Sequence, residues 1–281
     1  MLTQRDLVLA DGRTVRCYDT GDGTDGDGAA PGGLTVLWHH GSPQTGAPLA
    51  PIVSAAATRG IRLVSYARPS YGGSSPRPGR DVASAAADVE CIVDALGVDR
   101  FAVMGASGGG PHALACAALL PERVTGVVCL AGLAPLTDDF DWWAGMADDG
   151  GLRAAVEGRA ARERHQATAE FDENIFIPAD WAALKGAWAS LDADVARANA
   201  VGPDGLIDDD VAFVAPWGFE LSALVAPVLL VQGGQDRIVP PAHADWLRHH
   251  CPGAELWLRP ADGHLSVLDA CPAALDWLTQ Q

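Results

Sequence analysis

Short runs of aliphatic and β-branched residues alternate with longer segments of helical periodicity along most of the chain. The short runs predict buried strands, and the longer segments predict helices with one apolar face. Strands that alternate with helices in this order indicate βαβ units on a parallel sheet. The first such region predicts strand 34–38, helix 49–58, strand 61–66, helix 82–96, strand 101–104, helix 109–120 and strand 126–130. A second region predicts strand 227–231, helix 243–249, strand 255–258 and helix 265–278.

Helix 82–96 has clear boundary signals. Asp81 precedes it and is expected to cap its first turn, and Gly97 follows its last apolar position. Upstream, residues 7–18 predict a short hairpin that turns at Asp11-Gly12. The stretch 21–33 is rich in glycine and aspartate and predicts a flexible surface loop.

Between residues 134 and 224 the strand signals stop and the pattern becomes helical, with a break at Gly202-Pro203. A doubly wound sheet binds ligands beyond the carboxyl ends of its strands, so an insertion after strand 126–130 would cover that crevice. We therefore predict a core domain in two parts, 1–133 and 225–281, and an inserted helical cap, or lid, at 134–224.

Composition narrows the choice of partners. The chain has 281 residues, of which 48% are hydrophobic, enough for one large core. Its 36 acidic residues against 19 basic ones give a net charge of -17, which repels nucleic acid and anionic membranes. We expect a small-molecule substrate, with no nucleic acid and no membrane as partner. The sequence leaves the oligomeric state open.

The N-terminal residues contain no apolar signal-peptide region, and no run of about 18 apolar residues occurs, so we predict a cytoplasmic protein. The cysteines are widely spaced and include no Cys-x-x-Cys pair, which favours buried reduced thiols over disulfides or metal ligands. These residues are Cys17, Cys91, Cys116, Cys129, Cys251 and Cys271.

The most informative motif is GASGG at residues 105–109, which matches the pattern G-x-S-x-G. It lies between strand 101–104 and helix 109–120, where a nucleophilic serine is expected on a sharp turn. The glycines remove side chains that would collide in that turn, and the NH of Gly108 would point at a developing oxyanion. A plain glycine-rich turn or a phosphate loop is the alternative. The absence of a following Lys-Ser/Thr pair disfavours the phosphate loop, so we predict that Ser107 is the nucleophile.

A second oxyanion donor is expected after the first buried strand, in the segment WHHGSP at residues 38–43. The backbone NH of Ser42 is our candidate, and the NH of Gly41 is the neighbouring alternative. We interpret His39 and His40 as structural, because they precede the serine in the chain.

An acid and a base follow the serine. Asp236 comes just after strand 227–231, and His264 lies in the loop after strand 255–258. We predict that His264 takes the proton from Ser107 as general base and that Asp236 orients it and stabilises its imidazolium form.

Other residues compete for these two roles. Asp138, Asp139 and Asp262 are the alternatives for the acid. Five further histidines fall on predicted helices, where solvated or helix-terminal roles are more common: His112, His165, His243, His249 and His250.

These motifs together resemble the serine-nucleophile branch of the α/β-hydrolase fold superfamily. The resemblance rests on the HHGSP turn with Ser42, the GASGG elbow with Ser107 and Gly108, the GGQDRIVP segment with Asp236 and the DGH segment with His264. It implies an α/β fold with a mostly parallel, doubly wound sheet, a catalytic triad, an oxyanion hole and a cap.

The segment YARPSYGGS at residues 66–74 also looks like the family's D-R-P-G-Y-G-x-S turn, but departs from it at Ala67 and Ser70. We expect that departure to cost a local hydrogen bond rather than activity. Branches with an aspartate nucleophile are disfavoured by Ser107, and the amine-binding carboxylates of the proline iminopeptidases have no match in the predicted cap.

The resemblance implies hydrolysis of a carboxylic ester through an acyl-enzyme on Ser107, with no cofactor and no metal. Alternatives with the same triad are lactone or thioester hydrolysis, carbon-carbon bond hydrolysis and cofactor-free perhydrolysis. A catalytically idle small-ligand receptor is the alternative that is not an enzyme. Aromatic residues of the cap region are expected to divide between pocket lining and cap core: Trp142, Trp143, Trp181, Trp188, Trp217 and Phe219.

Overall fold

The computed structural model describes residues 2–21 and 33–281, and eight strands in these ranges form one sheet in the order β1-β2-β4-β3-β5-β6-β7-β8. The strands β1 and β2 form an antiparallel hairpin at one edge, β2 pairs antiparallel with β4, and the remaining neighbours are parallel. The strands are β1 (Thr3–Val8), β2 (Thr14–Asp19), β3 (Thr35–His39), β4 (Arg62–Tyr66), β5 (Phe101–Ala106), β6 (Val124–Leu130), β7 (Val228–Gly233) and β8 (Glu255–Arg259). The predicted loop 21–33 falls almost wholly on residues 22–32, outside the described residues.

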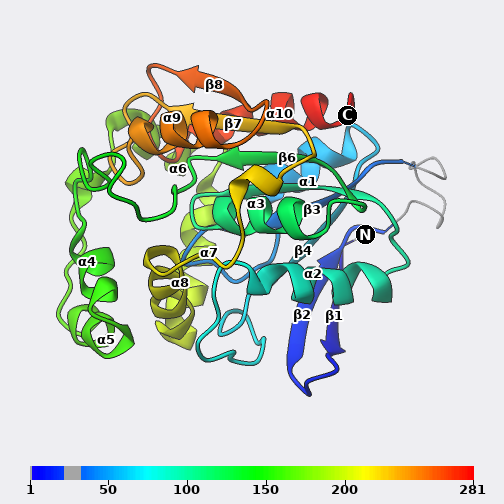
Figure 1. The fold of residues 1–281 in the computed structure, drawn as a ribbon, viewed down its shortest axis with the longest axis horizontal. Helices are drawn as coiled ribbons and strands as arrows, with labels where there is room; N and C mark the ends of the chain where they lie inside the picture. Colours follow the sequence, from blue (N-terminus) through cyan, green and yellow to red (C-terminus); the bar gives the residue numbers. More distant parts are fainter. Residues whose placement is uncertain (1, 22–32) are drawn as a thin grey trace.

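Helices cover both faces of the sheet, as Figure 1 shows. One face packs against α2 (Ser84–Ala95), α3 (Gly109–Leu119) and α9 (Pro241–His250), and the other against α1 (Ala50–Ala57) and α10 (Cys271–Leu278). Because successive strand residues point to opposite faces, each central strand contributes to both hydrophobic clusters. This explains why the parallel strands are continuous apolar runs in the sequence.

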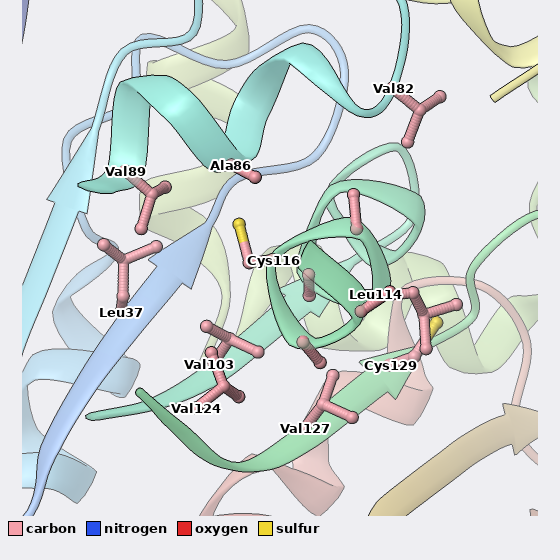
Figure 2. Close-up of a cluster of buried hydrophobic side chains, with 14 of the residues drawn as sticks. Leu37, Val82, Ala86, Val89, Val103, Leu114, Cys116, Val124, Val127 and Cys129 are labelled. Carbon is pink, nitrogen blue, oxygen red and sulfur yellow. The ribbon is translucent and has the colours of Figure 1, made fainter. Parts of the chain in front are cut away.

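Strand β3 illustrates this alternation. Leu37 belongs to the cluster under α2 and α3, whereas Val36 and Trp38 belong to the cluster on the opposite face. Figure 2 shows the first cluster, in which Leu37 lies near Val89 of α2 and Cys116 lies on the inner side of α3. The sheet therefore has two buried faces, and its carboxyl edge is left for loops.

Five helices lie between β6 and β7: α4 (Gly150–Val156), α5 (Arg159–Gln166), α6 (Pro178–Lys185), α7 (Ala189–Val201) and α8 (Asp204–Val214). Helices α4 and α5 project at the left of Figure 1 and pack against α8. Helix α6 contacts α7 and the 3-10 helix Ser266–Ala270. The helical pattern of the sequence in this region thus corresponds to helices, broken at Gly202 and Pro203 between α7 and α8.

Two predicted helix boundaries were wrong. The predicted helix 265–278 consists of the 3-10 helix Ser266–Ala270 followed by α10, because Pro272 has no NH to donate and fits only in the first turn of a helix. Helix α2 begins at Ser84 rather than Val82. The carboxylate of Asp81 nevertheless accepts the NH of Ser84, the first residue of the helix, at 2.8 Å, as expected for a residue that caps the first turn.

All six cysteines are free thiols, and five of them are buried. Cys91 is exposed, since it lies on the outer side of α2, so the prediction of burial was wrong for that residue. Within residues 2–21 and 33–281, no helix is long and apolar enough to cross a membrane.

Candidate active site

Loops at the carboxyl ends of four parallel strands meet at one edge of the sheet. The loop after β5 carries Ser107, the loop after β7 carries Asp236, and the loop after β8 carries His264. The loop after β3 adds Ser42. The structure therefore brings together the residues that the sequence singled out from positions up to 222 residues apart, from Ser42 to His264.

Ser107 occupies a sharp turn between β5 and α3. Its φ of 52° lies in the left-handed region, which is unfavourable for a residue other than glycine. A Cβ at Gly105 would overlap the carbonyl oxygen of Gly109, and a Cβ at Gly109 would overlap the carbonyl oxygen of His39. Both glycines are therefore required for the turn that exposes the serine.

His264 links the serine to the acid. Its Nε2 lies 2.9 Å from the Ser107 Oγ, and its Nδ1 lies 2.8 Å from the Asp236 Oδ2. Because a carboxylate can only accept, Nδ1 carries the proton, which leaves Nε2 free to accept the serine hydroxyl proton. This is the tautomer that a general base needs.

Two opposing effects set the pKa of His264. Burial lowers this pKa, but the negative charge of Asp236, the hydrogen bond to Asp236 and the charge of Asp180 raise it, and the net result is a pKa above the ordinary 6.5. The imidazolium form is therefore stabilised at the moment when the base has taken its proton.

Hydrogen bonds fix Asp236 in turn. Its Oδ1 accepts the backbone NH groups of Ile238 and Val239, both at 2.9 Å, and its Oδ2 accepts the side-chain amide of Gln232 at 3.2 Å. The side chain of Asp236 is fully buried. The carboxylate thus has one orientation, with one oxygen directed at the imidazole.

Ser42 and Gly108 lie next to each other beside Ser107. A Cβ at Gly108 would overlap the Ser42 Oγ, and a Cβ at Gly41 would come 3.6 Å from the Ser107 Cβ. The NH of Gly41 donates to the Gln44 Oε1 at 3.0 Å, so it is already engaged within the chain. Among the residues that the structure describes, the NH groups of Ser42 and Gly108 have no intramolecular acceptor.

The competing acids do not reach His264. The carboxylate of Asp262 pairs with Arg259 and turns away from the imidazole. Asp138 and Asp139 lie in the loop after β6, and the backbone NH of Asp139 bonds to Thr137. Of these candidates, Asp236 is the one within hydrogen-bond distance of the His264 ring.

The other histidines lie away from the Ser107 hydroxyl. His39 and His40 are fully buried, and burial, followed by nearby positive charge, holds the pKa of each well below 6.5. His243 bonds the Ala134 NH and the Trp142 carbonyl, and burial lowers its pKa to about 4. His165 lines the cavity described below.

A cavity of about 600 Å³ opens beside Ser107 and His264. Its core-side wall includes Trp38, Leu49 and Leu265. Its far wall is formed by the inserted helices and the segment between α5 and α6, with apolar lining from Leu152, Phe171, Phe176, Trp181, Leu191 and Val195. Polar groups gather where α5 meets α8, at Arg162, His165 and Asp210.

Sequence reasoning missed part of this site. Of the six aromatic residues considered for the pocket, Trp181 lines the cavity, whereas Trp142, Trp188 and Trp217 are buried in hydrophobic clusters. Phe171 and Phe176 line it without having been considered, although their spacing beside Trp181 was a visible signal. No local motif in the sequence pointed to the buried aspartates that bond to the loops of this site, such as Asp180.

The departure at Ser70 places a hydroxyl in the turn. Ser70 has a φ of 72°, the conformation for which the family's glycine is suited, and its hydroxyl donates to Asp208 at 2.9 Å. Serine thus adds a hydrogen bond at this position, and the loss of a local hydrogen bond expected from the departures at Ala67 and Ser70 together stays a prediction.

Comparisons with known proteins identify the family. Residues 35–270 match the model of the alpha/beta hydrolase fold family. The chain is 32% identical over 211 residues to a pimeloyl-[acyl-carrier protein] methyl ester esterase from Nitrosomonas europaea, which covers 74% of this chain and 80% of the relative. It is 31% identical over 196 residues to rhodomycin D methylesterase from Streptomyces peucetius, covering 61% and 63%.

Solved structures share the fold. A bromoperoxidase from Bacillus anthracis superposes with a TM-score of 0.74 at 21% identity, covering 99% of this chain and 100% of that one. An esterase from Exiguobacterium antarcticum superposes with a TM-score of 0.73 at 18% identity, covering 99% and 100%.

Proposed function

The chain belongs to the alpha/beta hydrolase fold family, and from this premise we propose that it is a serine hydrolase that cleaves a carboxylic ester of a small or medium apolar substrate. Its relatives include two methyl ester esterases, and the chain is an enzyme of the ester-hydrolase type. The proposal adds three statements to this class: which residue is the nucleophile, which residues form the triad, and how large the substrate is.

One observation carries the proposal: a continuous hydrogen-bonded chain joins Ser107, His264 and Asp236 at 2.9 and 2.8 Å. A serine hydroxyl is a weak nucleophile unless a base takes its proton as it attacks. The chain supplies the base, the group that orients the base, and the strained turn that exposes the hydroxyl.

In the first half-reaction, the Ser107 Oγ bonds to the ester carbonyl carbon while its proton passes to the His264 Nε2. The carbonyl oxygen gains the negative charge, and the NH groups of Ser42 and Gly108 are placed to donate to it. When the tetrahedral intermediate collapses, the carbon-oxygen bond to the alcohol breaks and His264 returns the proton to the leaving alkoxide.

The second half-reaction repeats these steps with water. His264 takes a proton from water while the water oxygen bonds to the acyl carbon. His264 then returns that proton to the Ser107 Oγ as the carboxylic acid leaves. Asp236 stabilises the imidazolium in both halves. Every group in this scheme comes from the chain itself.

The cavity supports an apolar substrate of limited size. Its volume of about 600 Å³ lies within the range of sites for small molecules, roughly 300 to 1,000 Å³. Because part of its wall comes from the helices between β6 and β7, we propose that residues 134–224 act as a cap that excludes water and limits substrate length.

The test is hydrolysis of p-nitrophenyl esters from acetate to decanoate, together with methyl esters of the corresponding acids. We expect activity in the wild type and a loss of several orders of magnitude in Ser107→Ala, as is usual when a triad acts as a unit. Ser54→Ala, at an exposed position of α1, is the matched control and should keep full activity.

The ester profile also reports the pocket. A fall in kcat/KM beyond a given acyl length would size the cavity. A folded wild type without activity on any of these esters would contradict the proposal and favour lactone, thioester or carbon-carbon bond chemistry by the same residues.

A further inference from the structure

Three aspartates of the inserted helices are almost completely buried and direct their carboxylates at core loops. Asp180 of α6 is 1% exposed, and Asp194 of α7 and Asp209 of α8 are 0% exposed. Burying a carboxylate is costly unless strong hydrogen bonds or positive charges compensate for the lost water. The partners of these three groups therefore show where the insertion is held to the core.

Asp209 contacts the oxyanion loop. Its Oδ2 accepts hydrogen bonds from Arg68 at 2.6 Å, from Tyr71 at 2.8 Å and from the Ser42 hydroxyl. Its Oδ1 accepts Arg80 at 2.5 Å. Through these contacts one carboxylate of α8 holds the side chain of Ser42, whose NH is the proposed oxyanion donor.

Arg68 strengthens this connection. Its guanidinium donates to the Ser42 Oγ at 2.9 Å and to the carbonyl oxygen of His40 at 2.5 Å. The loop that carries Ser42 is thus held at two points by Arg68, which is itself held by Asp209. The direction of the Ser42 NH depends on this arrangement, because the rotation of one peptide unit would turn it away.

Helix α8 also supports the second donor. Phe213 lies next to Gly108, since a Cβ at Gly108 would come 3.0 Å from its ring. Phe213 also packs edge-on against His112, with ring centroids 5.8 Å apart. His112 in turn bonds the carbonyl oxygen of Gly108 through Nδ1 at 2.8 Å.

Asp180 holds the loop of the base. Its Oδ1 accepts the NH groups of Leu265 at 2.9 Å and Ser266 at 2.8 Å, and the Ser266 hydroxyl at 2.8 Å. Leu265 directly follows His264 in the chain. A Cβ at Gly263, the residue before His264, would overlap the Asp180 carboxylate. The carboxylate therefore lies directly against the segment that presents the imidazole.

Asp194 adds a third point of attachment. It accepts the NH of Thr45 at 3.0 Å and the hydroxyl of Thr45 at 2.6 Å, just beyond the oxyanion loop. Helices α6, α7 and α8 are consequently bound to loops of the core, whereas α4 and α5 pack against each other and against α8.

We propose that Asp209 and Asp180 are positioning residues through which the inserted helices set the oxyanion hole and the base, so that docking of α6 and α8 is a condition of catalysis. This inference rests on the proposed function, and it assigns to the insertion a role beyond covering the substrate. The two residues act on different groups, so they have different kinetic signatures.

The part of the proposal that concerns Asp209 and the oxyanion hole, here called the oxyanion arm, is tested with Ser42→Ala. This variant keeps the backbone NH and removes the hydroxyl that Asp209 and Arg68 hold. We expect kcat to fall about tenfold or more, with KM changed less than about twofold, because an oxyanion donor contributes chiefly in the transition state. The rate constant for inactivation by a fluorophosphonate should fall in parallel. Asp209→Asn should lower kcat at least as much if near-ultraviolet circular dichroism shows that it folds.

Ser70→Ala is the matched control for this arm. It removes one hydrogen bond to α8, the bond to Asp208, from the core loop after β4 that also carries Arg68, and it leaves Ser42 unchanged. Its kcat should equal that of the wild type. An unchanged kcat in Ser42→Ala, or an equal fall in Ser70→Ala, would overturn the oxyanion arm.

The part of the proposal that concerns Asp180 and His264, here called the base arm, is tested with Asp180→Asn. This variant keeps an oxygen to accept the loop NH groups but removes the negative charge. The ionised groups that act on His264 are Asp236 and Asp180, and both oppose the effect of burial. The acid limb of kcat/KM should therefore shift to lower pH in Asp180→Asn. In Ser42→Ala the limb should stay where it is.

Asp262→Asn is the control for the base arm, because Asp262 lies two residues from His264 but pairs with Arg259. Its acid limb should match that of the wild type, and an unmoved limb in Asp180→Asn would overturn this arm. Wild-type activity that is lost in Ser107→Ala, together with an unchanged kcat in Ser42→Ala and an unmoved acid limb in Asp180→Asn, would refute the inference and leave the proposed function standing. A wild type that fluorophosphonate does not label at Ser107 would refute both.

Discussion

Two buried helices flank Ser107, and they are stabilised by different forces. Helix α3 starts at the turn that carries Ser107 and is buried from Gly109 to Ala118, mostly through glycine, alanine, leucine and cysteine. Helix α8 is also buried, but it carries three consecutive aspartates, Asp208, Asp209 and Asp210. Helix α3 is stabilised by apolar packing, whereas α8 is also held by ion pairs of its aspartates.

The three aspartates of α8 have separate partners. Asp208 pairs with Arg159, Asp209 with Arg68 and Arg80, and Asp210 with Arg162. Successive side chains on a helix point about 100° apart, so the three carboxylates reach three different surroundings. Arg68 and Arg80 belong to the core, and Arg159 and Arg162 to α5. Helix α8 therefore joins the core to α5 through ion pairs.

The largest effect is expected from Asp209→Ala. This substitution leaves the guanidinium groups of Arg68 and Arg80 buried without their carboxylate, and breaking a buried pair in this way costs about 3 to 5 kcal/mol. Urea unfolding, followed by circular dichroism, measures the free energy of unfolding. A loss below about 1 kcal/mol would mean that charge does not hold α8 in place.

The corresponding change in α3 is Leu114→Ala. Leu114 is 0% exposed in the cluster under α3, and removing its side chain leaves a cavity that costs about 3 kcal/mol. In contrast to Asp209→Ala, this loss should be insensitive to salt and pH because no charge is involved. A strong salt dependence of the loss in Leu114→Ala would contradict the distinction between the two helices.

A smaller effect is expected from the titration of Asp210. Burial raises its pKa to about 6, against the opposing charge of Arg162, whereas the ordinary value is 3.8. A folded pKa above the unfolded one means that the folded state binds the proton more tightly. The stabilisation is therefore complete below about pH 3.8 and is lost as the pH rises through about 6.

Relative to Asp210→Asn, the wild type should thus gain free energy of unfolding as the pH falls from 7 to 4, by an amount on the order of 2 kcal/mol. Asp276→Asn is the control, because the Arg59 hydrogen bond lowers the pKa of Asp276 from 3.8, so its contribution is lost only below that pH and should stay nearly constant from pH 7 to 4. Urea unfolding of the three proteins across this pH range measures the difference. A flat difference for Asp210→Asn would show that its carboxyl titrates as it does in water.

The smallest effect is expected at the surface of the same helical region. Glu163 pairs with Arg159 within α5 at 2.8 Å, and the side chains are 48% and 41% exposed. Exposed pairs at this spacing contribute at most about 0.5 kcal/mol, so Glu163→Ala should leave the free energy of unfolding nearly unchanged. A loss of unfolding free energy above about 1 kcal/mol would contradict the distinction between buried and exposed ion pairs.

The apolar parts of the molecule could be predicted from the sequence, because strands buried on both faces are continuous apolar runs that their local composition identifies. The match to the alpha/beta hydrolase fold family and the observed sheet confirm the predicted fold. The positions of Ser107, Asp236 and His264 followed from loops that come after strands. Their roles stay predictions that the experiments above address.

The charged parts could not be predicted, because their partners are distant in the chain. Asp209 and Arg68 are 141 positions apart, and Asp180 and Ser266 are 86 positions apart. Three consecutive aspartates suggest a solvated helix face when the sequence is considered alone. The break at Pro272 was visible but was outweighed by the apolar periodicity on both sides of it.

The most direct test of the central claim is to trap the acyl-enzyme. The protein is quenched in acid during turnover of p-nitrophenyl butyrate, and the intact protein and its peptides are analysed by mass spectrometry. The account predicts one butyryl group on the peptide that contains Ser107, and none in Ser107→Ala. The account would be contradicted by turnover of the ester with no adduct at any quench time, or by a butyryl group on a residue other than Ser107.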